Sequence, residues 1–291
     1  MAMGNMSTQP TVGVGLRHPH YEAALSRTAE IDFIEVHTEN FYGAGGASLA
    51  VLEQANEHYA LSLHCTALGL GSAAGLSTQA VNRLAQLVAR FNPMLVSDHL
   101  CFCWAQRGNT RVHAGDLLPL PRNEDALSVL TRNIDRVQQA IGRPLAVENI
   151  SSYIDQRGHR WSEPEFLHRL VERTGCQLLV DINNLLVNAH NAQIPAAEDY
   201  ARNWLDAIPR SAVAEIHLAG YTPVAPGQLA VDDHAAPVSD PAWRLYAHAL
   251  RRFGNVPTLV EWDNDLPEWP TLLAEASRAR DIHRDLLAAQ A

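Results

Sequence analysis

Short apolar runs separated by amphipathic stretches recur along most of the chain. Eight of these runs are four to seven residues long and rich in β-branched side chains, which is typical of buried strands. Runs that stay apolar, rather than alternating with polar residues, indicate strands covered on both faces, as in parallel sheets. The runs lie at 12–16 (VGVGL), 33–37 (FIEVH), 61–64 (LSLH), 94–100 (MLVSDHL), 144–150 (PLAVENI), 177–182 (QLLVDI), 214–220 (AEIHLAG) and 258–263 (TLVEWD).

Helical patterns with recognisable end signals fill the intervals between these runs. One is 78–91, where Val81, Leu84, Leu87 and Val88 share a face. A second, 124–141, lies between an N-cap asparagine and a terminating glycine, Asn123 and Gly142. Three more are predicted: from the capping box Ser162-x-x-Glu165 to Gly175, from Asp240-Pro241 to about Gly254, and from about Pro270 to Leu287.

Strands that alternate with helices predict parallel βαβ units. Eight such strands in 291 residues, near the ~250 typical of the fold, predict a closed (β/α)₈ TIM barrel over residues 12–288. Residues 1–11 carry no such pattern and are predicted to be a disordered N-terminal segment. A doubly wound open sheet is the alternative.

Polar side chains at the strand ends favour the barrel and indicate its chemistry. In a (β/α)₈ barrel the carboxyl ends of all strands meet at one mouth. Charged groups there are costly unless they neutralise each other or bind a cation, so the pattern predicts a metal cluster. The strand-end residues are Glu35 and His37, His64, Asp98 and His99, Glu148 and Asn149, Asp181, Glu215 and His217, and Glu261 and Asp263.

Imidazoles and carboxylates without obligatory thiolates suit iron, manganese, zinc or cobalt. His64, His99 and Glu148 are predicted to bind one ion, and a bridging Glu148 joins Asp181, His217 and Glu261 around a second. Asn184, Asp232 and His234 are candidates for a third site. Each residue also has a structural alternative: a histidine can be a hydrogen-bonded core residue, and a glutamate can pair with an arginine such as Arg17, Arg111 or Arg122.

Composition restricts the partners. A formal net charge of −10 disfavours binding to a nucleic acid backbone. No apolar stretch approaches the ~18 residues of a membrane span, and the N-terminus lacks a secretory pattern. Four cysteines without CxxC spacing predict reduced thiols in a cytoplasmic protein. No GxGxxG or Walker spacing follows a strand, so nucleotide binding is not indicated.

The motifs themselves resemble those of a known family, the multinuclear non-haem iron-dependent oxidases (MNIO), long described only as a domain of unknown function. The resemblance covers about residues 12–280. It rests on the segments GVGLRHPHY, IEVHTENFYGAGG, LSLHCTALGLGS, VSDHL, AVENISSY, LLVDINNLLVNAHN, AEIHLAGY, VDDHAAPVSDPAW and PTLVEWD.

Membership implies an endonuclease IV/xylose isomerase-like barrel that holds two or three iron ions, as mixed Fe(II)/Fe(III), and uses O₂ as co-substrate. It also implies modification of a ribosomally made precursor peptide at cysteine, together with a separate leader-binding partner protein; the methanobactin-pathway oxidase is one such enzyme. Of the ligand residues, Glu148, Asp181 and His217 are the expected catalytic ones. The family's ligands fall on His64, His99, Glu148, Asp181, Asn184, His217, Asp232, His234 and Glu261.

Some features leave alternatives open. Cys65, Thr66 and Asp98 depart from the family pattern, so the resemblance implies the family but no particular subfamily or substrate. An endonuclease IV-like hydrolase or an isomerase on the same barrel is one rival, disfavoured by the acidic charge and by Asn184, where endonuclease IV has a histidine. A metal-storing or scaffolding protein is another. Asn149, Asn183 and Glu215 are expected to orient the metal-binding imidazoles.

Overall fold

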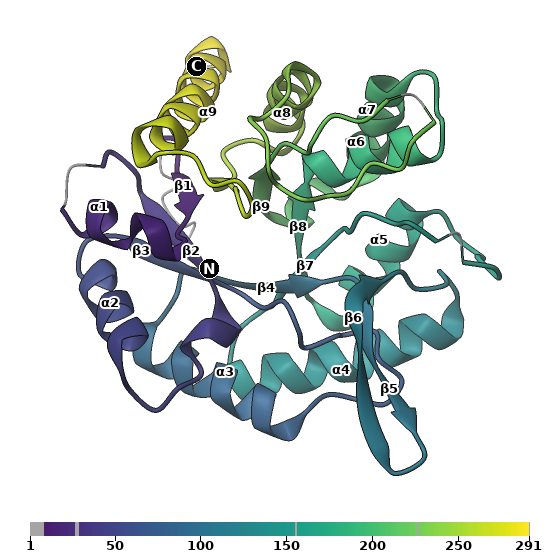
Figure 1. The fold of residues 1–291 in the computed structure, drawn as a ribbon. Helices are drawn as coiled ribbons and strands as arrows, with labels where there is room; N and C mark the ends of the chain where they lie inside the picture. The colour runs from purple at the N-terminus through teal and green to yellow at the C-terminus, as the bar shows by residue number, and fades with distance from the viewer. Residues whose placement is uncertain (1–8, 27–28, 155, 226, 291) are drawn as a thin grey trace.

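Eight parallel strands form a closed barrel, as the sequence predicts (Figure 1). The computed structural model describes residues 9–26, 29–154, 156–225 and 227–290. Neighbouring strands follow the order β1-β10-β9-β8-β7-β4-β3-β2, so the open sheet is excluded. The strands are β1 (Val12–Gly15), β2 (Phe33–His37), β3 (Ala60–His64), β4 (Leu95–His99), β7 (Ala146–Glu148), β8 (Gln177–Asp181), β9 (Val213–Leu218) and β10 (Thr258–Val260).

Helices surround the barrel, and the predicted end signals operate (Figure 1). The Asn123 side chain accepts the Ala126 N–H, and Ser162 and Glu165 form the reciprocal capping box. The helices are α1 (Tyr21–Leu25), α2 (Ala47–Asn56), α3 (Thr78–Phe91), α4 (Glu124–Ile141), α5 (Glu163–Thr174), α6 (Ile182–Asn191), α7 (Ala197–Ala207), α8 (Asp240–Phe253) and α9 (Trp269–Gln290), with short 3₁₀ turns η1 (His18–His20), η2 (Thr38–Phe41) and η3 (Arg210–Ala212).

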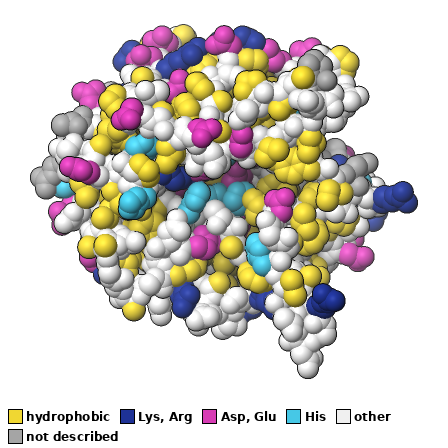
Figure 2. Space-filling model, viewed as in Figure 1, with side chains coloured by type: hydrophobic (Ala, Val, Ile, Leu, Met, Phe, Trp, Pro, Cys, Tyr) yellow, Lys and Arg dark blue, Asp and Glu magenta, His cyan; other side chains and the backbone are white. Residues whose placement is uncertain are grey.

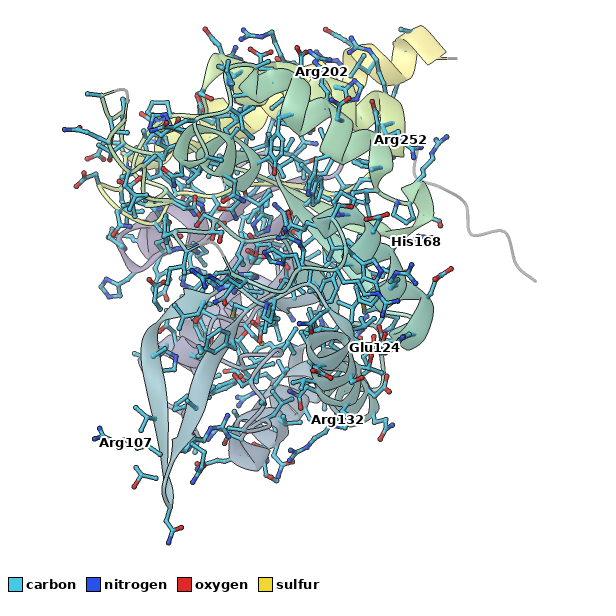
Figure 3. All side chains as sticks on the ribbon, turned by 90° about the vertical axis from the view of Figure 1, so that its right-hand side faces the viewer. Arg107, Glu124, Arg132, His168, Arg202 and Arg252 are labelled. Atoms are coloured by element: carbon cyan, nitrogen blue, oxygen red, sulfur yellow. The ribbon has the colours of Figure 1, made fainter. Side chains whose placement is uncertain are left out.

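An antiparallel hairpin between β4 and α4 was not predicted. It consists of β5 (Phe102–Arg107) and β6 (Thr110–Leu118), and it projects away from the barrel around Arg107 (Figure 3). Most of β6 is exposed, so it lacks the apolar run by which the barrel strands were recognised. Its base returns to the barrel mouth, where Asp116 and Leu117 line a cavity.

Contacts of the N-terminal segment with the barrel begin before the predicted boundary. The backbone oxygens of Gln9 and Pro10 accept hydrogen bonds from Asn255 and Arg280, and Pro10 is buried. Residues 1–8 of the predicted disordered segment lie outside the described residues. Among the helices of the described chain, none combines the length and apolar character that crossing a membrane requires.

Strand register brings the polar strand ends to a common level. His37 pairs with His64 across β2 and β3, and His99 pairs with Glu148 across β4 and β7. On the other side of the barrel, Asp181 at the end of β8 pairs with His217 on β9. Because the strands are parallel, all of these side chains lie at the carboxyl-terminal mouth.

Candidate metal centre

A cavity of about 250 Å³ opens at the barrel mouth. Histidine and acidic side chains gather in the hollow at the centre of this face (Figure 2). Seven of the nine predicted ligands line the cavity, and the other two, Asp181 and His217, lie beside it in clusters with Glu148. The structure thus brings the whole predicted set together. The seven are His64, His99, Glu148, Asn184, Asp232, His234 and Glu261.

Three ligand atoms on one side of the cavity form a nearly equilateral triangle. The Nε2 atoms of His64 and His99 are 3.3 Å apart, and Glu148 Oε2 lies 3.5 Å from the first and 3.4 Å from the second. Atoms bound tetrahedrally to one ion at about 2.1 Å are separated by about 3.4 Å. The His64 ring is fixed by a 2.8 Å hydrogen bond between its Nδ1 and Ser97 Oγ, which leaves Nε2 directed at the triangle.

Asp181 and Asn184 each use one polar side-chain atom in a hydrogen bond that stabilises the fold and leave the other side-chain atom unpaired. Asp181 Oδ1 accepts the backbone N–H of Asn184 at 2.6 Å and so caps α6. The Asn184 side chain donates through Nδ2 to the Asn149 backbone oxygen at 3.0 Å. Asp181 Oδ2 and Asn184 Oδ1 are buried and have no hydrogen-bond partner among the described residues. Both oxygens are therefore available to a cation.

Arg17, which follows β1, neutralises the carboxylates on the opposite side. Its guanidinium donates to Glu261 Oε1 at 3.0 Å and to Asp263 Oδ1 at 2.7 Å. Asp263 Oδ2 in turn lies 3.1 Å from His234 Nδ1, so His234 Nε2 faces the other way, toward Asp232 Oδ1 at 2.9 Å. Glu261 therefore keeps one oxygen, Oε2, for the cluster. The structural alternative for glutamate holds in part: Arg17 pairs with Glu261, whereas Arg111 and Arg122 donate to backbone oxygens.

Buried charge in the cluster is unbalanced, and a cation would remove the imbalance. Burial raises the pKa of Glu148 to about 7. Burial and the charge of Asp232 raise the pKa of Asp181 well above its usual range. Burial lowers the pKa of His99, but Glu148 and Asp98 outweigh it and raise that pKa to about 9. Glu148 Oε2, Asp181 Oδ2, Asn184 Oδ1 and His234 Nε2 all lack hydrogen-bond partners among the described residues. Unpaired buried donors and acceptors of this kind fit a bound metal.

Two of the three residues expected to orient imidazoles act differently. Asn149 exchanges two hydrogen bonds with the Asp181 backbone, at 2.9 and 3.0 Å, and fixes the strand end. Asn183 donates to Asp232 Oδ1 at 2.7 Å and so orients a carboxylate. The expectation was wrong for these two because the Asn149 amide is directed at the backbone of the adjacent strand and the Asn183 amide at the Asp232 carboxylate. Glu215 does lie beside an imidazole, 3.8 Å from His217 Nε2.

Arg17 and Asp263 complete the site, although neither was in the predicted ligand set. Asp263 was recognised only as a strand-end carboxylate, and Arg17 only as a candidate partner of a glutamate. The sequence carries only a weak signal for the role of Arg17, because no spacing rule connects a residue after the first strand with Asp263, 246 positions later.

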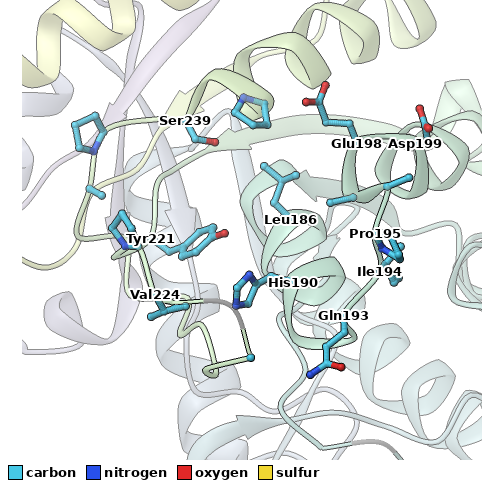
Figure 4. A pocket seen from close by; sticks show the side chains of 17 residues that line it. Leu186, His190, Gln193, Ile194, Pro195, Glu198, Asp199, Tyr221, Val224 and Ser239 are labelled. Atoms are coloured by element: carbon cyan, nitrogen blue, oxygen red, sulfur yellow. The ribbon is translucent and has the colours of Figure 1, made fainter.

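A larger groove of about 1230 Å³ lies away from this chemistry (Figure 4). It runs between the α6–α7 segment and the segment after β9, with Leu186, Ile194, Pro195, Tyr221 and Val224 in its lining. None of the nine predicted ligands lines it. Size alone would therefore point to a cavity that holds none of these side chains, and the cluster at the mouth is the better candidate site.

Solved structures show the same fold at low sequence identity. Endonuclease IV from Thermus thermophilus has a TM-score of 0.60 at 16% identity, covering 97% of this chain and 100% of that one. D-psicose 3-epimerase from Clostridium cellulolyticum has a TM-score of 0.59 at 11% identity, covering 95% and 99%. The predicted endonuclease IV/xylose isomerase-like barrel is confirmed.

Sequence comparisons identify the family. A UPF0276 protein of Vibrio vulnificus (strain CMCP6) is 40% identical over 284 residues, which is 97% of this chain and 94% of that protein. A UPF0276 protein of Caulobacter sp. (strain K31) is 44% identical over 274 residues, 94% and 96% of the two chains. Residues 11–284 match the family described as RiPP precursor modification enzyme MbnB/TglH/ChrH. The chain therefore belongs to this family of peptide-modifying enzymes, the MNIO family that its motifs resemble.

Proposed function

We propose that the protein is a multinuclear iron-dependent oxidase that uses O₂ to modify a ribosomally synthesised peptide. The modified residues are cysteines, as the family resemblance implies, and a separate partner protein binds the peptide's leader. The proposal places the enzyme in the cytoplasm, in agreement with four buried cysteines that form no disulfide.

The triangle of His64, His99 and Glu148 is the observation that carries the proposal. Two imidazole Nε2 atoms 3.3 Å apart beside a carboxylate oxygen have the spacing of ligands on one ion. Two further clusters support more than one ion: Glu148–Asp181–His217 shares Glu148 with the triangle, and Asp181–His234–Glu261 shares Asp181 with that second cluster. The mixed nitrogen and oxygen donor set suits iron.

Iron, when bound, supplies an open coordination position for a substrate thiolate and one-electron chemistry with O₂. The chain's own residues fix the geometry and limit water. Asp263 holds His234 by Nδ1, and Arg17 balances the negative charge of Glu261 and Asp263. Asp181 and His217 are fully buried, so their ligand atoms are presented without competing solvent.

The surroundings of the cavity suit a peptide. Ile150 and Tyr153 form walls of both the ligand cavity and a neighbouring cavity of about 490 Å³, which offers room for residues flanking the modified one. Ile154 and Leu229 line the second cavity and are large apolar side chains that remain 52% and 55% exposed. Exposed apolar side chains next to an active site are typical of a surface that binds another chain.

The experiment is anaerobic loading with Fe(II), followed by O₂ uptake and mass spectrometry with a cysteine-containing precursor peptide encoded beside the gene. O₂ consumption coupled to a mass change in the peptide is the expected result. Hydrolysis or isomerisation that proceeds without O₂ would refute the oxidase and favour the endonuclease IV-like alternative. Metal uptake with no chemistry on the peptide would favour storage or scaffolding. His64→Ala is the matched inactive control.

A further inference from the structure

Two carboxylates outside the predicted ligand set lie beneath the metal centre. Glu35 on β2 and Glu215 on β9 are both 0% exposed, and neither lines the cavity at the mouth. Glu35 Oε2 accepts the Ser62 hydroxyl at 2.7 Å, which fixes the side chain. Glu35 Oε1 and both Glu215 oxygens have no hydrogen-bond partner among the described residues. Two such buried groups require a donor or a cation directed at them.

His217 lies between these carboxylates and the metal centre, with its two ring nitrogens facing opposite sides. Nδ1 is 3.0 Å from Oε2 of Glu261, which lines the cavity. Nε2 is 3.5 Å from Glu35 Oε1 and 3.8 Å from Glu215 Oε1, in the closed interior of the barrel, and it has no hydrogen-bond partner among the described residues. Glu35, His217 and Glu261 also lie close enough together to hold one ion, so the two roles of Glu35, ligand and acceptor of the Nε2–H, must be distinguished. Neighbouring ligands of an octahedral ion, bound at about 2.1 Å, are about 3.0 Å apart, so the Nδ1–Oε2 spacing fits a shared ion as well as the hydrogen bond that these two atoms form without one.

The other three histidines of the predicted ligand set face the metal centre with Nε2, whereas His217 faces it with Nδ1. His64 has Nδ1 held by Ser97, and His234 has Nδ1 held by Asp263, so each presents Nε2. His99 presents Nε2 within the triangle. A neutral imidazole that gives one nitrogen to a metal keeps a proton on the other, and that N–H is almost always donated to a carboxylate, carbonyl or water.

We infer that His217 binds its metal through Nδ1, and that Glu35, together with Glu215, accepts the Nε2–H and fixes this orientation. Glu35 is thus a positioning residue rather than a ligand, and Ser62 anchors it. The inference rests on the proposed metal centre, since it states how one ligand of that centre is presented. Groups that orient a ligating histidine typically change metal affinity 10–100-fold when removed.

Nitrogen-15 NMR of the zinc-loaded protein tests the inference directly. Zinc is diamagnetic, and long-range ¹H–¹⁵N spectra of ¹⁵N-histidine-labelled protein distinguish a metal-bound nitrogen from a protonated one. The His217 signals are assigned by their loss in His217→Gln. Metal-bound Nδ1 and protonated Nε2 at His217, with the reverse at His64 and His234, is the expected result. A metal-bound Nε2 at His217 overturns the inference, because Glu35 would then be a ligand or a bystander.

Variants separate positioning from simple structural damage. Glu35→Gln should weaken zinc binding at one site 10–100-fold and shift the His217 Nε2–H resonance, while zinc at the triangle is retained. Ser62→Ala keeps the carboxylate and should give a smaller change in the same direction. Glu275→Gln is the matched control and should change neither, because Glu275 on α9 accepts the Val238 backbone N–H and belongs neither to the cavity lining nor to any of the ligand clusters. Unchanged zinc affinity and an unshifted resonance in Glu35→Gln would overturn the inference.

The outcome is distinct from that of the proposed function. Failure of zinc to bind the wild-type chain would refute the metal centre and the inference with it. Zinc binding through Nε2 would refute the inference alone. If zinc binds His217 through Nδ1 but the iron-loaded protein consumes no O₂ with any peptide, the oxidase proposal is refuted and the assignment of the His217 nitrogens stands.

Discussion

Replacing Glu148 with glutamine tests whether one carboxylate connects two metal ions. Glu148 ends β7 and belongs to two of the clusters, one with His64 and His99 and one with Asp181 and His217. Its Oε2 faces both histidines of the triangle at 3.4–3.5 Å and has no hydrogen-bond partner among the described residues. Glutamine preserves the shape of the side chain but removes the negative charge and one ligand oxygen.

The size of the effect follows from this shared position. Loss of a group that only orients a ligand already weakens metal binding 10–100-fold, so loss of a ligand charge should cost at least the upper value. A hundredfold change corresponds to about 2.8 kcal/mol per ion. Two ions should be affected, whereas the cluster around Asp232 and His234 should not. The metal-depleted variant should be no less stable than the metal-depleted wild type, because burial raises the pKa of Glu148 to about 7 and a neutral amide avoids the desolvation cost of the carboxylate.

Metal content by mass spectrometry, and affinity by competition with a chelator, measure the first effect. Thermal unfolding with chelator present measures the second. The expected result is a loss of two ions from Glu148→Gln at metal concentrations that saturate the wild type, with an unchanged or higher melting temperature in chelator. Glu275→Gln is the control and should keep the full metal complement. Full occupancy at wild-type affinity in Glu148→Gln would refute the bridging role.

Three further predictions concern stability. Arg17→Gln leaves the Glu261 and Asp263 carboxylates without their buried cation. The free energy of unfolding, measured by urea titration with chelator present, should fall by about 3–5 kcal/mol. A loss below about 1 kcal/mol would show that these ion pairs are not buried in solution. Ser162→Ala removes the capping-box hydroxyl of α5 and should cost about 1 kcal/mol by the same titration, an effect that Ser277→Ala, an exposed mid-helix control, should not reproduce. Burial, with a smaller contribution from the charge of Arg280, lowers the pKa of His283 to about 4, so the folded state disfavours protonation of this side chain. The contribution of neutral His283 to the free energy of unfolding is therefore complete above pH 6.5 and is lost as the pH falls from there toward 4. His283→Leu should therefore reduce the drop in unfolding free energy between pH 7 and pH 5 by about 1–2 kcal/mol, and identical pH profiles for the two proteins would contradict the reasoning.

The barrel was predictable because its signals are local. Each strand is a short apolar run, and the helix ends at Asn123, Gly142 and Ser162 form through contacts within a few residues of each position. The β5–β6 hairpin escaped prediction because β6 is largely exposed, and an exposed strand in contact with one neighbour leaves no apolar run in the sequence.

The predicted ligands converge because strand ends in a parallel barrel must meet. That argument places His64, Glu148 and Asp181 at one mouth of the barrel from the sequence pattern alone. It cannot say which atom of each side chain is free, because that depends on partners from elsewhere in the chain. Asp181 Oδ1 caps α6 while Oδ2 stays unpaired, and only the packed structure separates the two.

The sequence by itself determined the eight strands, the caps of the main helices and the identity of the polar residues at the mouth, since all of these follow from side-chain chemistry and spacing over short distances. Tertiary structure alone decided that Arg17 meets Asp263 across 246 positions, that the two nitrogens of His217 face different carboxylates, and that the cluster lies in the smaller cavity rather than the larger groove. The reason is physical: closing the barrel sets distances between residues remote in sequence, and those distances fix which buried charges are paired and which are left for a metal.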